Sequence, residues 1–313
     1  MSRSGDVIKI RMARLDDTAG IVDVHRSHVG QWYRQIDSER HDVGYDSLTI
    51  DERFGFGGPW MSPETCSVHL NHLLLRRQLP LVVETGGRIV AQAELFIGRE
   101  GKRYGKNCHI GLLFVHRDFL GQGIGARLID HAVQVAGEQD CDTLTVASDE
   151  IHEQFYRRSG FSFGESLVFV EMSTGKRPAD YEVLPPQVSA QSFAWGMDMV
   201  MGRVQSSAQH LSEYADNYAI ATYGEITHRM HFLRIGGYDT MVALVGHGSG
   251  MTVAGAWSRD ADLRGVAGAT LALAGAAGIR AVKTYMFVKD YESIKDGYEA
   301  RVIGQRHTLM RRL

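Results

Sequence analysis

Three glycines stand at alternate positions, Gly121, Gly123 and Gly125, between an apolar run and a second run with helical spacing. A strand that turns through glycines into a helix leaves the first N–H groups of that helix unpaired. These groups and the helix dipole favour an anion, and glycine lets a phosphate approach the backbone closely. The segment therefore predicts a phosphate site, with an ordinary tight turn as the alternative.

The spacing of the glycines narrows the choice of phosphate cofactor. A P-loop requires a lysine after its last glycine, and none follows here. A dinucleotide loop, Gly-x-Gly-x-x-Gly/Ala, is matched by Gly121, Gly123 and Ala126. That loop normally opens a parallel βαβ unit, whereas this one follows a predicted hairpin and a further strand. An NAD(P)-dependent oxidoreductase is therefore the weaker alternative.

The passage resembles the GNAT superfamily of N-acetyltransferases, whose acyl-CoA loop reads Arg/Gln-x-x-Gly-x-Gly/Ala after the fourth strand. Here the loop runs from Leu120 to Gly125, and a second family element, Tyr-x-x-x-Gly-Phe, is present as Tyr156, Gly160 and Phe161. The order of predicted elements over residues 8–172 is also similar. Leu120 stands where the family often has Arg or Gln. We therefore expect backbone N–H groups, rather than a side chain at this position, to bind the pyrophosphate.

The resemblance implies transfer of an acyl group, usually acetyl, from acyl-CoA to an amine on a small molecule or peptide. Tyr156 would act as the general acid that protonates the departing CoA thiolate. The strand before the loop would present its backbone to the pantetheine arm. The cofactor residues expected from the resemblance are Leu113, Phe114, Val115, Leu120, Gly121, Gln122, Gly123, Ile124, Gly125 and Ala126.

A base must take a proton from the attacking amine, and two side chains are candidates. Glu94 lies on a predicted strand, where it shares a face with Gln92, and His109 lies near the start of the next strand. For both, the alternative is a side chain that is merely hydrogen-bonded or exposed.

An aromatic and glycine-rich passage falls where acceptor substrates are bounded in the family. Phe54, Phe56 and Trp60 would form an apolar wall, with the intervening glycines letting the loop bend. The alternative is a loop that packs its aromatic side chains beneath itself. If Trp60 plugs the acceptor cleft, a non-catalytic module that binds acyl-CoA becomes the better reading.

Other segments predict the elements that position these residues. Ser62 and Pro63 are typical of a helix start, and that helix should run to about Arg77. Thr85, Gly86 and Gly87 join two β-rich runs as a hairpin. Residues 18–36 follow an aspartate pair and are expected to be helical.

A second half echoes the first after a proline-containing stretch. We expect a catalytic domain over residues 1–175, a linker over 176–192 and a degenerate GNAT-like domain over 193–313. In the second half the glycine loop reads from Asp262 to Ala267, and a carboxylate beside a pyrophosphate is unfavourable. The predicted fold class is α/β of the α+β type, with tandem domains that each have a mixed, mostly antiparallel sheet flanked by helices.

Composition limits the partners. The formal charge is −3 over 313 residues, so no basic field predicts nucleic acid or an anionic membrane, and no segment is typical of a signal peptide or membrane span. Three separated cysteines predict neither a disulfide framework nor a zinc site, and the scattered histidines predict no metal. A cytoplasmic protein is expected, and a homodimer is left open.

Overall fold

The computed structural model describes residues 7–37, 39–101, 103–148, 150–175, 179–214, 227–246, 250–260 and 262–313. These residues form two compact units. The first contains residues 7–95 and 110–135, and the second contains the described parts of 96–109 and 136–313. Part of the expected linker, residues 176–178, lies outside the described residues. The expected division at residues 175 and 193 stays a prediction.

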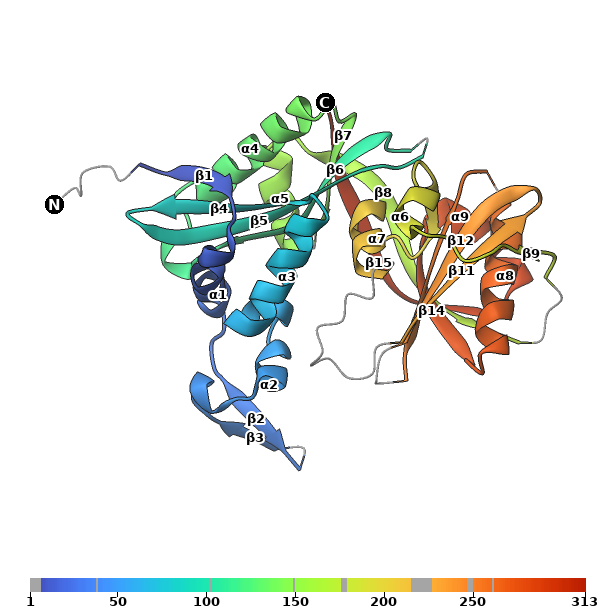
Figure 1. Cartoon of the computed structure of the whole chain (residues 1–313), viewed down its shortest axis with the longest axis horizontal. Coiled ribbons are helices and arrows are strands. Elements are labelled where there is room, and N and C mark those ends of the chain that lie inside the picture. Colours follow the sequence, from blue (N-terminus) through green and yellow to red (C-terminus); the bar gives the residue numbers. More distant parts are fainter. Residues whose placement is uncertain are drawn as a thin grey trace. The chain divides into compact units, whose positions relative to one another are not determined.

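The first unit has the strand order β1-β4-β5-β6, beside a separate hairpin of β2 and β3 (Figure 1). Strands β1 and β4 pair antiparallel, as do β4 and β5. Helices α1 and α3 lie on one side of the β4–β5 hairpin and α4 on the other (Figure 1). The elements are β1 (Lys9–Met12), α1 (Thr18–Arg26), β2 (Tyr33–Ile36), β3 (Glu39–Asp42), α2 (Ile50–Phe54), α3 (Pro63–Leu75), β4 (Leu79–Thr85), β5 (Arg88–Arg99), β6 (Lys106–Val115) and α4 (Ile124–Glu138).

Local sequence explains several of these boundaries. Ser62 caps α3, because its side chain accepts a hydrogen bond from Thr65 N, and Pro63 follows as the first helical residue. Gly86 and Gly87 turn the β4–β5 hairpin with φ angles of 56° and 76°, which favour glycine. Both the helix start and the hairpin confirm the predictions from sequence.

The helix predicted over residues 18–36 is wrong in its second half. Helix α1 ends at Arg26, and residues 33–36 form β2, which pairs with β3. The aromatic Trp32 and Tyr33 explain the difference, because their rings pack against Phe56 at centroid distances of 4.6 and 5.0 Å. Contacts with residues distant in sequence thus determine that residues 33–36 form a strand rather than a helix.

The core of the first unit is formed between its helices and its sheet. Apolar side chains of α1 and α3 meet those of β4 and β5, and Phe114 of β6 packs against this set. Burial of this apolar surface is what holds the helices on the sheet. The buried members are Ala13, Ile21, Val22, Val24, Cys66, Leu70, Val82 and Ile89.

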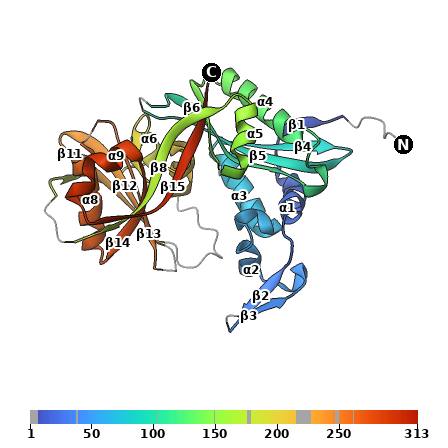
Figure 2. The ribbon, with the colours of Figure 1, turned by 180° about the vertical axis from the view of Figure 1, so that it is seen from behind.

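The second unit has the strand order β6-β7-β15-β8-β14-β13-β12-β11-β9, with β10 paired to β13. The long strands β8 and β15 run side by side, as Figure 2 shows. The elements are β7 (Thr143–Ser148), α5 (Glu150–Arg158), β8 (Ser162–Ser173), β9 (Glu182–Val183), α6 (Ala190–Phe193), β10 (Asp198–Met201), α7 (Ser207–Tyr214), β11 (Thr227–Ile235), β12 (Tyr238–Gly246), β13 (Thr252–Ser258), α8 (Leu263–Ala276), β14 (Ala281–Phe287), α9 (Val288–Ile294) and β15 (Ala300–Arg312).

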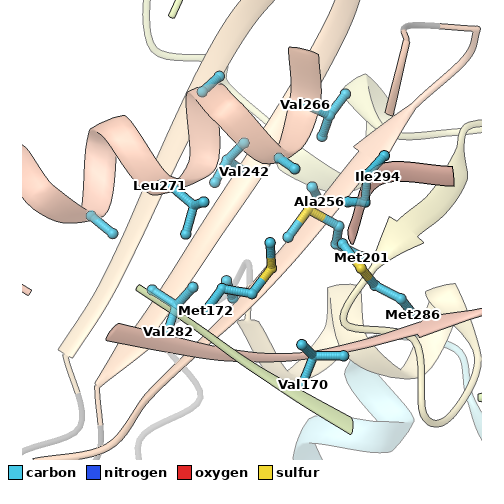
Figure 3. Packing of buried hydrophobic residues seen from close by; sticks show 14 of the residues in the cluster. Val170, Met172, Met201, Val242, Ala256, Val266, Leu271, Val282, Met286 and Ile294 are labelled. Carbon is cyan, nitrogen blue, oxygen red and sulfur yellow. The ribbon is translucent and has the colours of Figure 1, made fainter. Parts of the chain in front are cut away.

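The core of the second unit lies between α8 and the strands it covers. Val266 and Leu271 of α8 face Val242, Ala256 and other strand residues in Figure 3. The many alanines of α8 let the helix approach the sheet closely, and Val266, Ala267 and Ala274 are fully buried. Figure 3 also labels Val170, Met172, Met201, Val282, Met286 and Ile294 of this core.

The predicted fold class is confirmed. Helices flank a mixed sheet in which most described pairs are antiparallel, and β13 and β14 form a parallel pair. No helix within the described ranges is long and apolar enough to cross a membrane.

Candidate functional site

The glycine segment forms an exposed turn that opens α4. Gly121 and Gly123 have φ angles of 74° and 77°, in the left-handed region that favours glycine. Among the described residues, no heavy atom outside their neighbours lies within 4 Å of a Cβ built on either glycine. The backbone conformation therefore demands glycine here, and the space beside it is open.

Helix α4 begins directly after this turn. Arg127 N donates to Gly123 O at 3.1 Å, which closes the first turn of the helix. The N–H groups of residues 124–126 precede this hydrogen bond and have no acceptor within the helix. Ile124 anchors the turn, because it is 2% exposed, whereas the uncharged Leu120 is 55% exposed.

The strand expected to face a cofactor carries one backbone group that is already engaged. Val115 O accepts a hydrogen bond from His28 Nε2 at 2.8 Å. Val115 is buried, and Leu113 and Phe114 are half-buried. Leu113 and Phe114 thus remain as the candidates for backbone contact with a ligand.

Glu94 lies at the centre of a buried polar cluster in the first unit. Its Oε1 accepts hydrogen bonds from Trp60 Nε1 at 2.8 Å and from Gln92 Nε2 at 2.8 Å. His69 Nε2 lies 3.0 Å from Oε1 and 3.2 Å from Oε2. Because Oε1 has three partners and Oε2 has one longer contact, Oε2 keeps the larger share of its accepting capacity.

A histidine that was not singled out from sequence joins this cluster. His25 Nε2 lies 2.7 Å from Gln92 Oε1, and the ring stacks on Trp60 with a centroid distance of 5.2 Å. The ring also contacts Phe114 at a centroid distance of 4.5 Å. Gln92 was foreseeable from the alternation of β5, but His25 and His69 are distant in sequence and carried no local signal.

The aromatic passage separates into two parts. Trp60 lies in the short 3-10 helix Gly58–Met61 and reaches Glu94. Gly58 permits this, because its φ is 86° and a Cβ there would lie 3.3 Å from the Trp60 ring. Phe56 instead packs on Trp32 and Tyr33. Phe54 is the last residue of α2.

Tyr156 lies on α5 in the second unit. It is 8% exposed, and its ring meets Phe155 and Phe161 edge-on at centroid distances of 5.0 and 5.7 Å. Gly160, with a φ of 84°, ends the helix so that Phe161 N donates to Tyr156 O. The Tyr-x-x-x-Gly-Phe element is therefore a helix terminus that fixes the tyrosine ring.

His109 is enclosed in the second unit. Its Nδ1 lies 2.8 Å from Thr145 Oγ1 and its Nε2 lies 2.7 Å from Gln205 Oε1. Burial lowers the pKa of His109 to about 4, against a smaller opposing effect of the Gln205 hydrogen bond. A buried, neutral ring with both nitrogens engaged favours Glu94 over His109 as the base.

The cysteines are poor nucleophiles in this fold. All three, Cys66, Cys108 and Cys141, are buried and free. Burial raises the pKa of Cys66 to about 12, and the nearby charge of Glu94 adds to the increase. No group of ligands suited to a metal ion occurs among the described residues.

The matching helix start in the second half is already capped. Asp262 Oδ2 accepts a hydrogen bond from Gly265 N at 3.2 Å, at the start of α8. A Cβ on Gly265 would lie 3.0 Å from Ile235, so this glycine is closely packed rather than open. The two loops therefore differ as the sequence predicted, because a carboxylate stands where an anion would bind.

Comparisons with known proteins address the fold. Three solved structures that are similar over nearly the whole chain are a GCN5-related N-acetyltransferase from Kribbella flavida (13% identity, 98% of this chain and 71% of that chain, TM-score 0.59), one from Anabaena variabilis (12%, 97% and 72%, 0.58) and Eis1 from Mycobacterium abscessus (12%, 98% and 73%, 0.53). No curated protein matches the sequence.

One family model matches part of the chain. Residues 45–161 match the model of the acetyltransferase (GNAT) family. The matched region contains Trp60, Glu94, the glycine segment and Tyr156. Over residues 45–161, the chain is thus similar to the GNAT acetyltransferase family.

Proposed function

We propose that this protein transfers an acyl group, specifically acetyl, from acyl-CoA to an amine. The observation that carries the proposal is the open turn at Gly121 and Gly123, whose left-handed backbone leads into the first amides of α4, which have no acceptor within the helix. This arrangement suits a pyrophosphate held by backbone N–H groups, and it lies within the region that matches the GNAT family.

The proposed chemistry is direct attack. The amine nitrogen attacks the thioester carbonyl carbon, so that a C–N bond forms and the C–S bond breaks. Glu94 Oε2 takes the proton released from nitrogen, directly or through water, because it is the carboxylate oxygen with fewer partners. The Tyr156 hydroxyl protonates the CoA thiolate, a role that rests on the resemblance of its sequence element to the family.

A non-catalytic acyl-CoA-binding module is the second candidate, and one contact favours it. The Trp60 indole donates to Glu94 Oε1 at 2.8 Å, and Glu94 is only 2% exposed. A tryptophan that permanently covers the carboxylate would exclude an acceptor. An enzyme requires the Trp60 side chain to move away from Glu94 when the acceptor binds, whereas a binding module does not.

Two measurements test the proposal. Thermal-shift titration with acetyl-CoA and with NAD should show stabilisation by acetyl-CoA; stabilisation by NAD alone would favour the oxidoreductase instead. Thiol detection of released CoA across a panel of small amines, amino acids and peptides should then show acceptor-dependent release. Stabilisation by acetyl-CoA with no release from any amine would favour the binding module.

A further inference from the structure

The cluster around Glu94 has a defined direction of hydrogen bonding. Gln92 Oε1 can only accept, so His25 Nε2, at 2.7 Å, must carry the hydrogen. The Gln92 amide then presents its Nε2 to Glu94 Oε1 at 2.8 Å. The order of donors runs from His25 through Gln92 to the carboxylate.

The surroundings of His25 hold its ring in place. The ring packs against Trp60 and Phe114, at centroid distances of 5.2 and 4.5 Å, and the residue is 1% exposed. Phe114 belongs to the strand expected to face the cofactor, and Trp60 covers Glu94. His25 therefore contacts both parts of the candidate site that lie in the first unit.

Burial keeps this ring neutral. It lowers the pKa of His25 to about 4, with the Gln92 hydrogen bond and the charge of Glu94 opposing the decrease. The other titratable groups that act on it are His28 and His69. Since a neutral imidazole has one donor, the contact with Gln92 uses the only N–H of His25.

We propose that His25 is a positioning residue for acyl transfer: through Gln92 it fixes a donor on Glu94 Oε1 and so leaves Oε2 as the oxygen that receives the proton of the acceptor amine. The inference rests on the proposed function. Without the His25 donor, the Gln92 amide can rotate by 180° and turn its oxygen toward the carboxylate. The carboxylate then faces an acceptor in place of a donor, which disfavours its negative charge.

The test uses His25→Phe, which keeps an aromatic ring against Trp60 and Phe114 but removes the donor, and Gln92→Leu, which removes the amide. In each variant the acid limb of the pH profile of kcat/KM should move to higher pH by about one unit, with about a tenfold loss below that limb. The double variant should behave like Gln92→Leu alone, because the two residues act in series. Exposed His41→Phe, on β3, is the control and should leave the profile unchanged.

Additive shifts in the double variant would overturn the proposal, since they would mean that His25 acts through packing alone. A readout independent of activity is the ¹⁵N spectrum of the histidine rings in the full chain. At pH 7 the His25 proton should be on Nε2, and a proton on Nδ1 would also overturn the proposal. If the unsubstituted protein transfers no acyl group, the proposed function fails, and the Nε2 signal still reports the His25–Gln92 contact separately.

Discussion

Arg203 Nε lies 2.9 Å from Glu100 Oε2, and each of the two side chains is only 2% exposed. Asn107 Nδ2 and Ser207 N also donate to this carboxylate. Arg203→Met should lower the free energy of unfolding by about 3–5 kcal/mol, because it leaves the Glu100 charge buried without its counter-ion. Chemical denaturation of the variant and of the original protein measures the difference.

The control for this pair is Arg234→Met, which breaks an exposed ion pair with Asp239 at 3.3 Å. It should change the free energy of unfolding by less than about 1 kcal/mol. Equal losses in the two variants would contradict the argument that burial sets the cost.

Gly123→Ala should weaken acetyl-CoA binding more than tenfold. The substitution forces a Cβ into the left-handed region, at a cost of about 1 kcal/mol, and places a methyl group where the pyrophosphate would approach. Gly87→Ala is the matched control, because Gly87 has a similar φ of 76° and equally open surroundings in the β4–β5 turn. Both variants should lose similar stability, and only Gly123→Ala should lose affinity in a calorimetric titration.

Leu120→Arg should tighten acetyl-CoA binding about two- to fivefold. Leu120 is exposed beside the glycine turn, and a guanidinium there would add a charge-assisted hydrogen bond to the phosphates. Leu75→Arg, at the exposed end of α3, adds the same charge elsewhere and should leave the affinity unchanged. An equal gain from both substitutions would indicate a general charge effect.

Tyr156→Phe should lower kcat by about 10²-fold or more while leaving the dissociation constant of acetyl-CoA nearly unchanged. The loss follows from removing the hydroxyl that would protonate the thiolate. Tyr238→Phe, at the exposed first residue of β12, serves as the control. Unchanged turnover in Tyr156→Phe would remove this tyrosine as the general acid.

Stability should fall as the pH drops from about 6.5 toward 4. Burial lowers the pKa of His25 and of His109 to about 4 and that of His210 to about 3. In this window the unfolded chain binds protons that the folded protein excludes, so each histidine contributes a slope of up to about 1.4 kcal/mol per pH unit. Denaturation at several pH values should show the slope, and His109→Gln should reduce it.

Glu100 adds a second loss at lower pH. Burial alone would raise its pKa, but the charge and hydrogen bonds of Arg203 and a hydrogen bond from Asn107 lower it below the ordinary value of 4.5. A carboxyl group with a lowered pKa stabilises the fold above the unfolded value and loses this contribution as the pH falls through the folded value. In Arg203→Met this acid-dependent loss should therefore become smaller.

Patterns that depend on neighbouring residues were sufficient to predict much of the fold. The cap at Ser62, the Gly86–Gly87 turn and the strand, glycine turn and helix around Gly123 all follow from short segments whose backbone preferences agree with the observed structure. The segment after Arg26 was mispredicted, because its β2 strand depends on β3 and on the Phe56 ring.

The site could be predicted only in part for the same reason. Glu94 and Gln92 lie two residues apart on β5, so their shared face was visible in the sequence. His25 on α1 and His69 on α3 reach the same carboxylate cluster only because both helices pack on the sheet. No spacing along the chain encodes that meeting.

The Asp262 carboxylate that caps α8 competes with any external anion for the amides at the start of that helix. Its carboxylate is tethered to the helix that it caps, so an incoming phosphate must displace an anion held at an effective concentration on the order of millimolar or more. Loss of ligand binding at such a loop requires only one acidic side chain at the cap and no change of fold. Conversely, Asp262→Asn would remove the tethered charge while keeping a capping oxygen. An incoming anion would then compete with a neutral group for the α8 amides.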